Sequence, residues 1–320
     1  MPRVSVIIPG FNAEAHIAET LRSVEAQTYV DWEVVLCDDG STDSTVEIAN
    51  GFGRRVRIVR NSRNFGPATA RNRAIAESTG ELLAFLDADD YWLPEYLEYQ
   101  VSLFDEGHSR HGDVGIVACN ADVLGPDGFL DTTYMDIFGF PGGVTLDRML
   151  KSNPIFVSAL SPREVVDQAG GFCPEIFGTE DFDLWIRILE LGYRVVATRR
   201  TLGVHRVGHP SVSVNLSRMA RALQSTYRRA LERGNLTPRQ RRIAGRELRL
   251  QRTLEEIDSI AAAGRDPNGA LPYVRIARVL PLLLLTAAEH PNRWLHGARM
   301  VAHGRRPGVP WKVATRFSVH

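Results

Sequence analysis

Three carboxylates directly follow an apolar segment of the chain. Asp87, Asp89 and Asp90 come immediately after the run Leu82–Leu86. If this run is a strand of a parallel sheet, the acids lie at its carboxyl end, where open α/β sheets bind their ligands. Carboxylates this close together can present oxygens to Mg²⁺ or Mn²⁺, which usually completes its coordination with water and substrate phosphates. The alternative is a solvated acidic loop, because short acidic motifs are common.

A second acidic segment follows the apolar run Glu33–Cys37. The Asp39 carboxylate can accept the ring N–H of a pyrimidine base, which makes Asp39 a candidate nucleotide contact. The alternative is that Ser41 or Asp43 caps the next helix while Asp38 and Asp39 face solvent. The residues alone leave both interpretations open.

Arg71 stands one turn into a helix that we expect to begin at Pro67, after the turn-forming Gly66. Its guanidinium can pair with a phosphate or orient a carboxylate. The alternative is an ordinary exposed arginine on a helix.

Glu180 and Asp181 open another expected helix, directly after Thr179. One of these carboxylates can face a substrate as a general base, although the helix dipole alone also favours acids in a first turn. His205 follows an expected strand. A single histidine is more often structural than a ligand, but a metal held by two aspartates has open coordination positions.

The elements that position these residues alternate between strand and helix. Over the first part of the chain the spacing is roughly 25 residues, which implies a mostly parallel sheet with right-handed crossovers. A helix capped by Asn12 is expected after the first strand, and the segment 122–143 reads as loop-rich. The expected strands are Val4–Ile8, Glu33–Cys37, Val56–Val59, Leu82–Leu86, Val114–Ala118 and Arg194–Ala197, and the expected helices include Pro67–Ser78, Asp181–Leu191, Ser217–Arg233 and Pro238–Ala263.

Five segments in a fixed order resemble glycosyltransferase family 2. They are VSVIIPGFN at 4–12, DDGSTD at 38–43, NFGPATARN at 64–72, DADD at 87–90 and TEDFDLW at 179–185. The resemblance covers residues 2–210 and implies a GT-A fold, which is an α/β fold with a mostly parallel, Rossmann-like sheet flanked by helices. It also implies an inverting enzyme that uses a nucleotide-diphosphate sugar and a divalent metal.

The resemblance assigns donor-binding roles to four residues. The family's base- and ribose-contacting positions correspond to Pro9, Phe11 and Asp39, and its nucleotide-contacting arginine corresponds to Arg71. Tyrosine is frequent in the family where this chain has Phe11. A hydroxyl contact is therefore lost there, and only stacking remains.

The resemblance also assigns the metal and the base. The family's DxD motif corresponds to Asp87 and Asp89, and Asp89 is expected to contact Mn²⁺ or Mg²⁺ directly. His205 resembles a histidine that contacts the metal or the diphosphate in some members. The catalytic base corresponds to Asp181, with Glu180 as a neighbour that positions the acceptor or the base. No QxxRW motif and no multi-span membrane region follows, which argues against a processive synthase.

Charge divides the chain into two parts. Residues 1–198 carry 15 Lys and Arg against 31 Asp and Glu, and residues 199–320 carry 23 against 7, which together give the 38 and 38 of the whole chain. We expect a catalytic domain at 1–212, with a donor half at about 1–111 and an acceptor half at about 112–212. A basic, mainly helical extension follows at 213–320. The extension is expected either to contact anionic lipid, through 271–296, or to pack on the catalytic domain or on a second copy.

Several other classes fit the sequence less well. The arginines between 213 and 270 are accompanied by a single aromatic residue, Tyr227, so nucleic-acid binding is not expected. No GxGxxG follows the first strand, which argues against a dehydrogenase. Three cysteines without a CxxC motif and a short apolar N-terminal run predict a cytoplasmic protein, with peripheral contact at the inner membrane face as an added hypothesis.

The substrate assignment follows from the donor contact. A UDP-sugar is favoured because Asp39 suits a uracil N–H, and the acceptor is expected to be a glycan or a lipid-linked glycan. A thymine ring presents the same edge as uracil, and a GDP-sugar is a further alternative, so the nucleotide, the sugar, the acceptor and the linkage stay open. A sugar-nucleotidyltransferase, or a catalytically silent homologue that binds nucleotide sugars, is the alternative.

Overall fold

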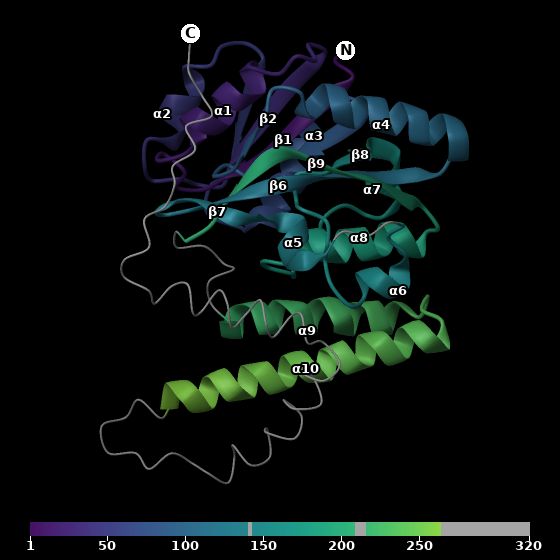
Figure 1. Cartoon of the computed structure of the whole chain (residues 1–320). Coiled ribbons are helices and arrows are strands. Elements are labelled where there is room, and N and C mark those ends of the chain that lie inside the picture. Colours follow the sequence, from purple (N-terminus) through teal and green to yellow (C-terminus); the bar gives the residue numbers. More distant parts are fainter. Residues whose placement is uncertain (140–142, 209–215, 264–320) are drawn as a thin grey trace.

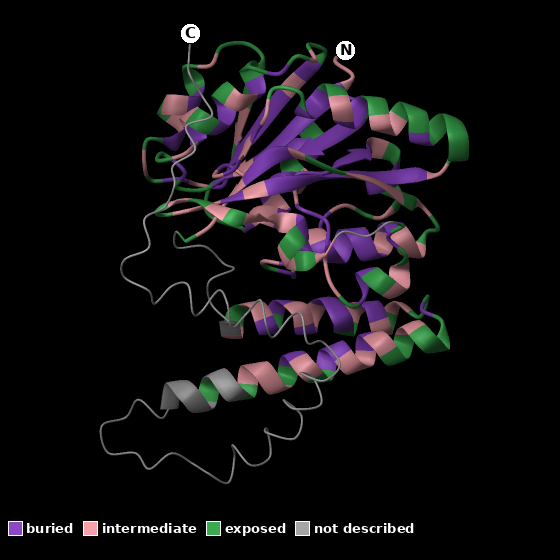
Figure 2. Cartoon of the chain, viewed as in Figure 1, coloured by how far each residue is buried: buried purple, intermediate pink, exposed green. Residues whose placement is uncertain are grey.

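The computed structural model describes residues 1–139, 143–208 and 216–263. One nine-stranded sheet forms the centre, in the order β3-β2-β1-β4-β8-β6-β9-β5, with β7 paired to β6. Its central strands β1, β2, β4 and β6 are buried along most of their length (Figure 2). Helices cover both faces of the sheet, as the alternating strand–helix pattern predicts (Figure 1).

The N-terminal half of the sheet is parallel. The strands β1 (Val4–Gly10), β2 (Trp32–Asp38), β3 (Val56–Arg60) and β4 (Leu82–Phe85) pair in register in one direction. Three of them, β1, β2 and β4, are mostly apolar and buried along nearly their whole length, as expected of strands covered on both faces. The crossovers contain α1 (Ile17–Glu25), α2 (Thr45–Asn50) and α3 (Pro67–Glu77).

The expected Asn12 cap is wrong. The helix α1 begins five residues later, after His16, and Asn12 has a positive φ of 49°. Its side-chain oxygen instead accepts the backbone N–H of Thr42 at 2.9 Å, and its backbone N–H donates to Ser41 Oγ at 2.9 Å. Asn12 therefore joins the loop after β1 to the loop after β2. Asparagine tolerates this backbone conformation better than most residues.

The second half of the sheet is mixed. The long strands β6 (Val114–Gly125) and β9 (Arg194–Arg206) pair in parallel and share the direction of β1–β4, so six of the nine strands run one way. Three short strands run against them, namely β5 (Tyr91–Trp92), β7 (Gly128–Thr133) and β8 (Leu160–Pro162). The predicted GT-A architecture with a largely parallel sheet is confirmed.

The loop expected at 122–143 is partly wrong. The strand β6 continues to Gly125 and turns back into β7, which leads into the short helix α5 (Tyr134–Phe138). Polar residues along this hairpin hide the period-2 pattern that marks a strand. The helices α4 (Tyr96–His111), α6 (Leu146–Met149), α7 (Arg163–Gln168) and α8 (Glu180–Glu190) complete the catalytic part.

The helices α9 (Leu216–Arg233) and α10 (Pro238–Ala263) follow, as the sequence predicts. They lie beneath α8 and α6, with α10 outermost (Figure 1). Buried residues of the two helices and of the turn between them, including Tyr227, Leu236 and Leu248, belong to the same apolar core as α8. Tyr227 packs edge-on against Phe182 at 5.8 Å between ring centres. The described start of the extension therefore shares its core with the catalytic part.

The lipid-contacting segment expected at 271–296 lies outside the described residues. In the part of the chain that the structure describes, no helix combines the length and the apolar character needed to cross a membrane.

Candidate active site

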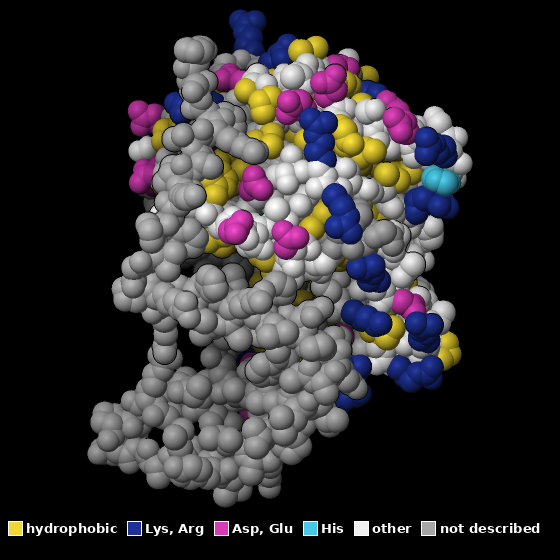
Figure 3. Space-filling model, viewed as in Figure 1, with side chains coloured by type: hydrophobic (Ala, Val, Ile, Leu, Met, Phe, Trp, Pro, Cys, Tyr) yellow, Lys and Arg dark blue, Asp and Glu magenta, His cyan; other side chains and the backbone are white. Residues whose placement is uncertain are grey.

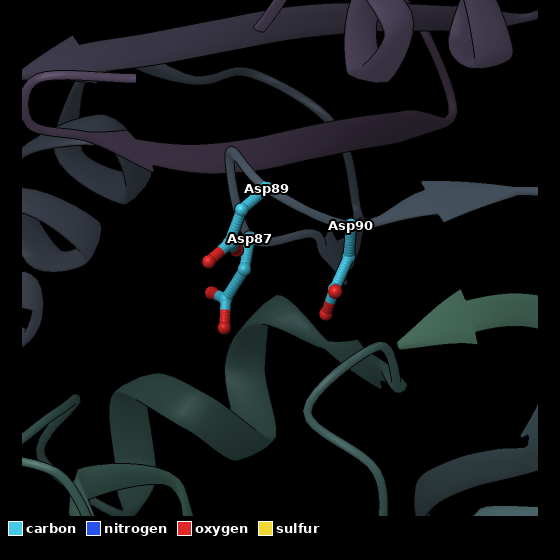
Figure 4. A group of neighbouring side chains, drawn as sticks. All are labelled: Asp87, Asp89 and Asp90. Atoms are coloured by element: carbon cyan, nitrogen blue, oxygen red, sulfur yellow. The ribbon is translucent and has the colours of Figure 1, made fainter. Parts of the chain in front are cut away.

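The acidic loop after β4 brings three carboxylates together. One oxygen from each of Asp87, Asp89 and Asp90 lies within 4.8 Å of the other two. All three side chains leave the loop toward the same side (Figure 4). The sequence assignment named Asp87 and Asp89 as metal ligands and omitted Asp90, although the DADD pattern contains it.

Backbone contacts hold this loop in place. The Asp90 N–H donates to the Asp87 carbonyl at 3.2 Å, which closes a tight turn. The Thr20 hydroxyl lies 2.9 Å from the Ala88 carbonyl and 2.8 Å from the Asp90 carbonyl. From β9, Arg206 Nε donates to the Asp89 carbonyl at 2.8 Å. These contacts come from elements on both sides of the loop and fix where its carboxylates point.

The cluster carries excess negative charge. Burial, and then the charges of Asp90 and Asp87, raise the pKa of Asp89 to about 7. Two neighbouring carboxylates repel each other when both are ionised, and a bound cation relieves this repulsion. An oxygen-only donor set suits the hard cations Mg²⁺ and Mn²⁺. The residues present therefore fit the metal that the sequence predicts.

His205 lies at the edge of this cluster. Its Nδ1 is 3.2 Å from Asp90 Oδ2, and the neighbouring Arg206 N–H donates to Asp90 Oδ1 at 2.7 Å. Burial lowers the pKa of His205, but the charge and hydrogen bond of Asp90, together with the charges of Asp87 and Asp89, outweigh it and leave the pKa raised. The structure thus places His205 beside the acids, paired with Asp90. The resemblance implies contact with the metal or the diphosphate, which stays a prediction.

Arg71 is buried and bridges two acids. Its Nη1 donates to Glu180 Oε1 and its Nη2 to Asp87 Oδ1, both at 2.5 Å. The guanidinium also lies over the Phe172 ring, 5.2 Å from the centre. The alternative of an exposed helix arginine is wrong. Gly66, with φ of 94°, precedes α3 and lets Pro67 begin it, which sets Arg71 one turn into the helix.

The two acids at the start of α8 point to different partners. Glu180 Oε1 accepts from Arg71, and Oε2 accepts the Gly178 N–H at 2.7 Å. Asp181 Oδ2 accepts from Asn153 Nδ2 at 3.1 Å. Residues one position apart diverge by about 100° around a helix, which separates the two roles. Sequence reasoning missed Asn153, because no pattern signals a single asparagine in a loop.

The Asp181 carboxyl has an unusual pKa. Burial, and then the charge of Glu180, raise it to about 7, while Arg71 acts in the opposite direction. Thr179 is the N-cap residue of α8, but its side chain makes no cap hydrogen bond at this described helix start. The Thr179 hydroxyl instead lies 2.9 Å from the Thr226 hydroxyl of α9. The segment before Asp181 is thus held from the C-terminal helices.

Asp39 is buried and accepts hydrogen bonds with both carboxylate oxygens. Its Oδ1 accepts from Asn61 Nδ2 at 2.7 Å, and its Oδ2 accepts the N–H groups of Phe65 and Gly66 at 3.0 and 2.7 Å. Asp38 is fully buried and accepts from Arg60 Nε at 2.9 Å. The solvated alternative for this pair is therefore wrong. Asp39 fixes the loop that leads into α3.

The remaining predicted residues lie at the end of β1. Pro9 is half-buried in the strand, beside Cys37 of β2, and Phe11 is 45% exposed just beyond it. The Asn12 contacts described above join this strand end to the loop that follows Asp39. The structure thus brings Arg71, Asp87 and Glu180 into direct contact and sets Pro9, Phe11 and Asp39 on adjoining strand ends.

Fold and site together define a class of protein. A parallel α/β half with an acidic cluster at the carboxyl end of β4, joined through Arg71 to an acid pair at a helix start, is the arrangement of a glycosyltransferase with a GT-A fold. The family model "Glycosyl transferase family 2" matches residues 5–132.

Named relatives extend this match beyond the donor half. The putative teichuronic acid biosynthesis glycosyltransferase TuaG of Bacillus subtilis (strain 168) is 30% identical over 231 residues, which cover 71% of this chain and 88% of TuaG. WfgD of Escherichia coli, named UDP-Glc:alpha-D-GlcNAc-diphosphoundecaprenol beta-1,3-glucosyltransferase, is 30% identical over 189 residues, which cover 58% of this chain and 70% of WfgD. The chain belongs to glycosyltransferase family 2 and is a glycosyltransferase.

Solved structures agree on the fold. The S. aureus TarS fragment 1–349, solved with UDP-GlcNAc, has a TM-score of 0.64 at 18% identity, and the match covers 87% of this chain and 79% of that one. The mannosyltransferase PcManGT from Pyrobaculum calidifontis, solved with GDP-Man and Mn²⁺, has a TM-score of 0.62 at 24% identity, with 95% and 86% covered. The match to the longer TarS chain spans only 39% of it.

Proposed function

We propose that this glycosyltransferase is metal-dependent and inverting, and that it moves a sugar from a nucleotide-diphosphate sugar to a hydroxyl of a glycan or lipid-linked acceptor. One observation carries the proposal. The Asp181 carboxylate, with a pKa of about 7, adjoins a buried ion network that reaches the acidic cluster through Glu180, Arg71 and Asp87. The ion network therefore connects the proposed base to the proposed metal-binding acids.

The donor binds, in this proposal, across the ends of β1 and β2. Phe11 is exposed there and offers a ring for stacking on the base. Asp39 Oδ1 has one hydrogen-bond partner in Asn61, and a carboxylate oxygen can accept a second N–H. A uracil N–H matches this acceptor, which favours a UDP-sugar. The donor in the name of WfgD is UDP-Glc, which supports the same choice.

Asp87, Asp89 and Asp90 would hold the Mg²⁺ or Mn²⁺ ion, with His205 beside them. A bound ion would neutralise charge on the departing diphosphate. The chain's own residues set this up, because Arg71 keeps Asp87 oriented and Asp90 is fixed by Arg206. PcManGT was solved with Mn²⁺, which supports a divalent metal here.

Asp181 acts as the general base. With a pKa of about 7 its carboxylate is half ionised at neutral pH and accepts a proton readily, which is the tuning that general-base catalysis favours. It takes the proton of the acceptor hydroxyl while that oxygen attacks the anomeric carbon from the face opposite the diphosphate. A single displacement inverts the configuration. Asn153 holds the Asp181 carboxylate in position, and Glu180 holds Arg71.

The acceptor is proposed to be a lipid-linked glycan. The diphosphoundecaprenol acceptor in the name of WfgD supports this choice. The loops around the site determine which sugar is transferred and which linkage is formed.

The experiment is a transfer assay with purified chain, a panel of nucleotide sugars, Mn²⁺ and a short lipid-diphosphate sugar. We expect release of nucleoside diphosphate and, by NMR, a product with inverted anomeric configuration. Release of pyrophosphate would identify a nucleotidyltransferase instead. Donor binding without turnover on any acceptor would favour the silent homologue, and a retained configuration would remove the single-displacement mechanism.

A further inference from the structure

Four aromatic rings form a row that begins beside the acidic cluster. His205, which pairs with Asp90, is the first ring. Its centre lies 5.2 Å from the centre of the Phe156 ring and 6.0 Å from that of the Tyr134 ring. Tyr134 also packs on Phe156 at 5.3 Å and on Phe138 at 4.5 Å between ring centres. We call His205, Phe156, Tyr134 and Phe138 the aromatic row.

The outer end of the aromatic row is exposed. Phe138, the last residue of α5, is 45% exposed, and Tyr134 is half-buried. Hydrophobic side chains are scattered among charged ones over the described surface (Figure 3), so exposure alone does not mark a site. Phe138 is of interest because its ring continues inward, through Tyr134, to a histidine paired with an acid of the cluster. The aromatic row therefore connects the protein surface with the proposed metal-binding acids.

One short segment joins the aromatic row to the proposed base. Asn153 Nδ2 donates to Asp181 Oδ2 at 3.1 Å, and Asn153 Oδ1 accepts the Ile155 N–H at 3.1 Å. The Ile155 carbonyl lies 3.5 Å from the Tyr134 hydroxyl, at the limit of a hydrogen bond. Phe156 follows directly and packs on the Tyr134 ring. This segment therefore sets the Tyr134 ring and the Asp181 carboxylate in a defined relation to each other.

The charges of the site act on Tyr134. Burial, and then the charges of Asp181 and Asp90, raise the pKa of its hydroxyl. These two carboxylates belong to different elements, since Asp181 lies at the start of α8 and Asp90 in the loop after β4. A side chain on which both charges act lies within range of the proposed base and of the proposed metal-binding acids at once.

A buried asparagine orders the helix that carries the outer two rings. Asn120 of β6 donates from Nδ2 to Thr133 Oγ1 and accepts the Met135 N–H at Oδ1, both at 3.0 Å. Thr133 also closes a capping box at the start of α5. A helix of 5 residues is too short to be stable by itself, so these contacts determine its place. They hold the Tyr134 and Phe138 rings in position, which lowers the entropy cost of binding a ligand there.

We propose that the aromatic row binds the acceptor sugar, with Phe138 and Tyr134 stacked on the apolar face of a pyranose ring. The inference rests on the proposed function, because an acceptor hydroxyl has to reach Asp181. A pyranose has C–H groups on its faces and hydroxyl groups around its edge. The face of an aromatic ring carries partial negative charge and attracts such C–H groups. The carboxylates at the inner end of the row are acceptors for sugar hydroxyls.

The position of the row favours the acceptor over the donor. The donor is proposed to bind across the ends of β1 and β2, whereas all four rings belong to the expected acceptor half at 112–212. They come from α5, from the segment after α6 and from β9. The row also ends at the segment that holds the proposed base. A sugar lying along it has its edge directed toward Asp181.

A lipid chain fits the aromatic row less well than a sugar. A prenyl chain is apolar along its whole length, whereas the inner end of the row carries His205 and Asp90. Covering these polar groups with hydrocarbon would cost free energy, because a chain without donors or acceptors replaces their water. A ligand with an apolar face and a polar edge matches both ends of the row.

The test measures how sugar binding depends on the Phe138 ring. The probes are methyl pyranosides of several common hexoses, observed by saturation-transfer NMR with the full chain, UDP and Mg²⁺. We expect at least one of them to bind, and Phe138→Ala to raise its dissociation constant by roughly 10-fold. Phe138→Trp restores an aromatic face and is expected to recover most of this loss. The unfolding temperature should not change in either variant, because Phe138 is exposed.

Phe129 provides the matched control. It is 46% exposed and lies on β7, five residues or roughly 16 Å of strand before Tyr134. Phe129→Ala is expected to bind the pyranosides as the wild type does. An equal loss in this control, unchanged binding by Phe138→Ala, or no pyranoside binding by the wild type would overturn the proposal. Weaker binding of farnesyl phosphate by Phe138→Ala, with unchanged pyranoside binding, would assign the row to the lipid instead.

Transfer kinetics separate this proposal from the proposed function. In an active enzyme, Phe138→Ala should raise the acceptor KM by the same factor with little change in the donor KM. An unchanged acceptor KM would refute the aromatic row as an acceptor site and leave the transferase mechanism intact. Pyranoside binding that depends on Phe138, in a wild type that transfers no sugar, would keep the row as a sugar-binding site and refute the proposed function alone.

Discussion

Replacing the Asp181 carboxylate by an amide is expected to abolish transfer and to stabilise the fold at the same time. Burial and the neighbouring Glu180 raise the pKa of Asp181 from 3.8 to about 7. A carboxyl group with a raised pKa binds its proton more tightly in the folded state than in the unfolded state. The folded state therefore loses stability as the pH rises from about 4 to about 7, and the full cost is present at pH 8.

The pKa difference sets the magnitude. Each unit corresponds to about 1.4 kcal/mol, so the ionised Asp181 costs the fold about 4 kcal/mol at pH 8. At pH 5 much of the carboxyl is protonated in the folded state, and the cost is about 2 kcal/mol. Asp181→Asn removes this cost and keeps an oxygen that accepts from Asn153. The variant should therefore gain stability, and the gain should be larger at pH 8.

The assay is urea unfolding at both pH values without metal, alongside transfer rates at saturating donor. An amide cannot take the acceptor proton, so transfer should fall by roughly 10²–10⁴-fold while donor binding persists. The exposed Asp127 provides the control, since Asp127→Asn should change neither stability nor rate. If the variant is less stable at pH 8, or is shifted equally at both pH values, the raised pKa of the Asp181 carboxyl is refuted.

Glu180→Gln tests the division of roles in the acid pair. The Glu180 charge raises the pKa of Asp181, so its removal should lower that pKa and move the acid limb of the kcat/KM profile to lower pH. The amide oxygen of the variant can still accept from Arg71, and transfer should continue at a reduced rate. If Glu180→Gln is inactive while Asp181→Asn keeps most of its activity, the base is Glu180.

Three further outcomes are expected. Asp89→Ala should lose nearly all transfer yet remain folded, because it removes one of three clustered acids; wild-type turnover of this variant in excess EDTA would contradict the metal assignment. Asn153→Ala removes a hydrogen bond to the charged form of Asp181, so the acid limb of kcat/KM should rise by roughly one pH unit; an unchanged profile would exclude this positioning role. Arg233→Ala leaves two buried carboxylates of α8 with fewer partners and should cost about 3 kcal/mol in urea unfolding. Replacing the exposed Arg228 of the same helix is the control, with a change below about 0.5 kcal/mol.

The parallel half of the fold was predictable because its signals are local. Continuous apolar runs mark strands covered on both faces, and Gly66-Pro67 marks a helix start. In a parallel sheet, the residues that follow the strands all lie at the same edge. The position of Asp39 after β2 and of Asp87 after β4 at this edge therefore follows from the topology alone. The short antiparallel strand β8 gave no such signal, because its pairing depends on β4 and β6, which are distant in sequence.

The roles inside the site were less predictable than its location. Nothing in NFGPATARN distinguishes a buried arginine from an exposed one, since both occur one turn into a helix. The burial of Arg71 arises from Asp87 and Glu180, which lie 16 and 109 residues away along the chain. Asp39 likewise shows its structural role only once Phe65 and Gly66 are placed.

The proposed catalytic base lies far beyond the family-matched segment at 5–132 and depends on contacts there. Asp181 lies after that segment, and the helix it begins is held from below by α9. Thr226 contacts Thr179 just before the acid pair, and Arg233 pairs with the fully buried Asp183 on the same helix. These contacts fix the helix start from the side opposite Arg71, which holds Glu180. The described C-terminal helices therefore help to hold the helix start that carries the proposed base, Asp181.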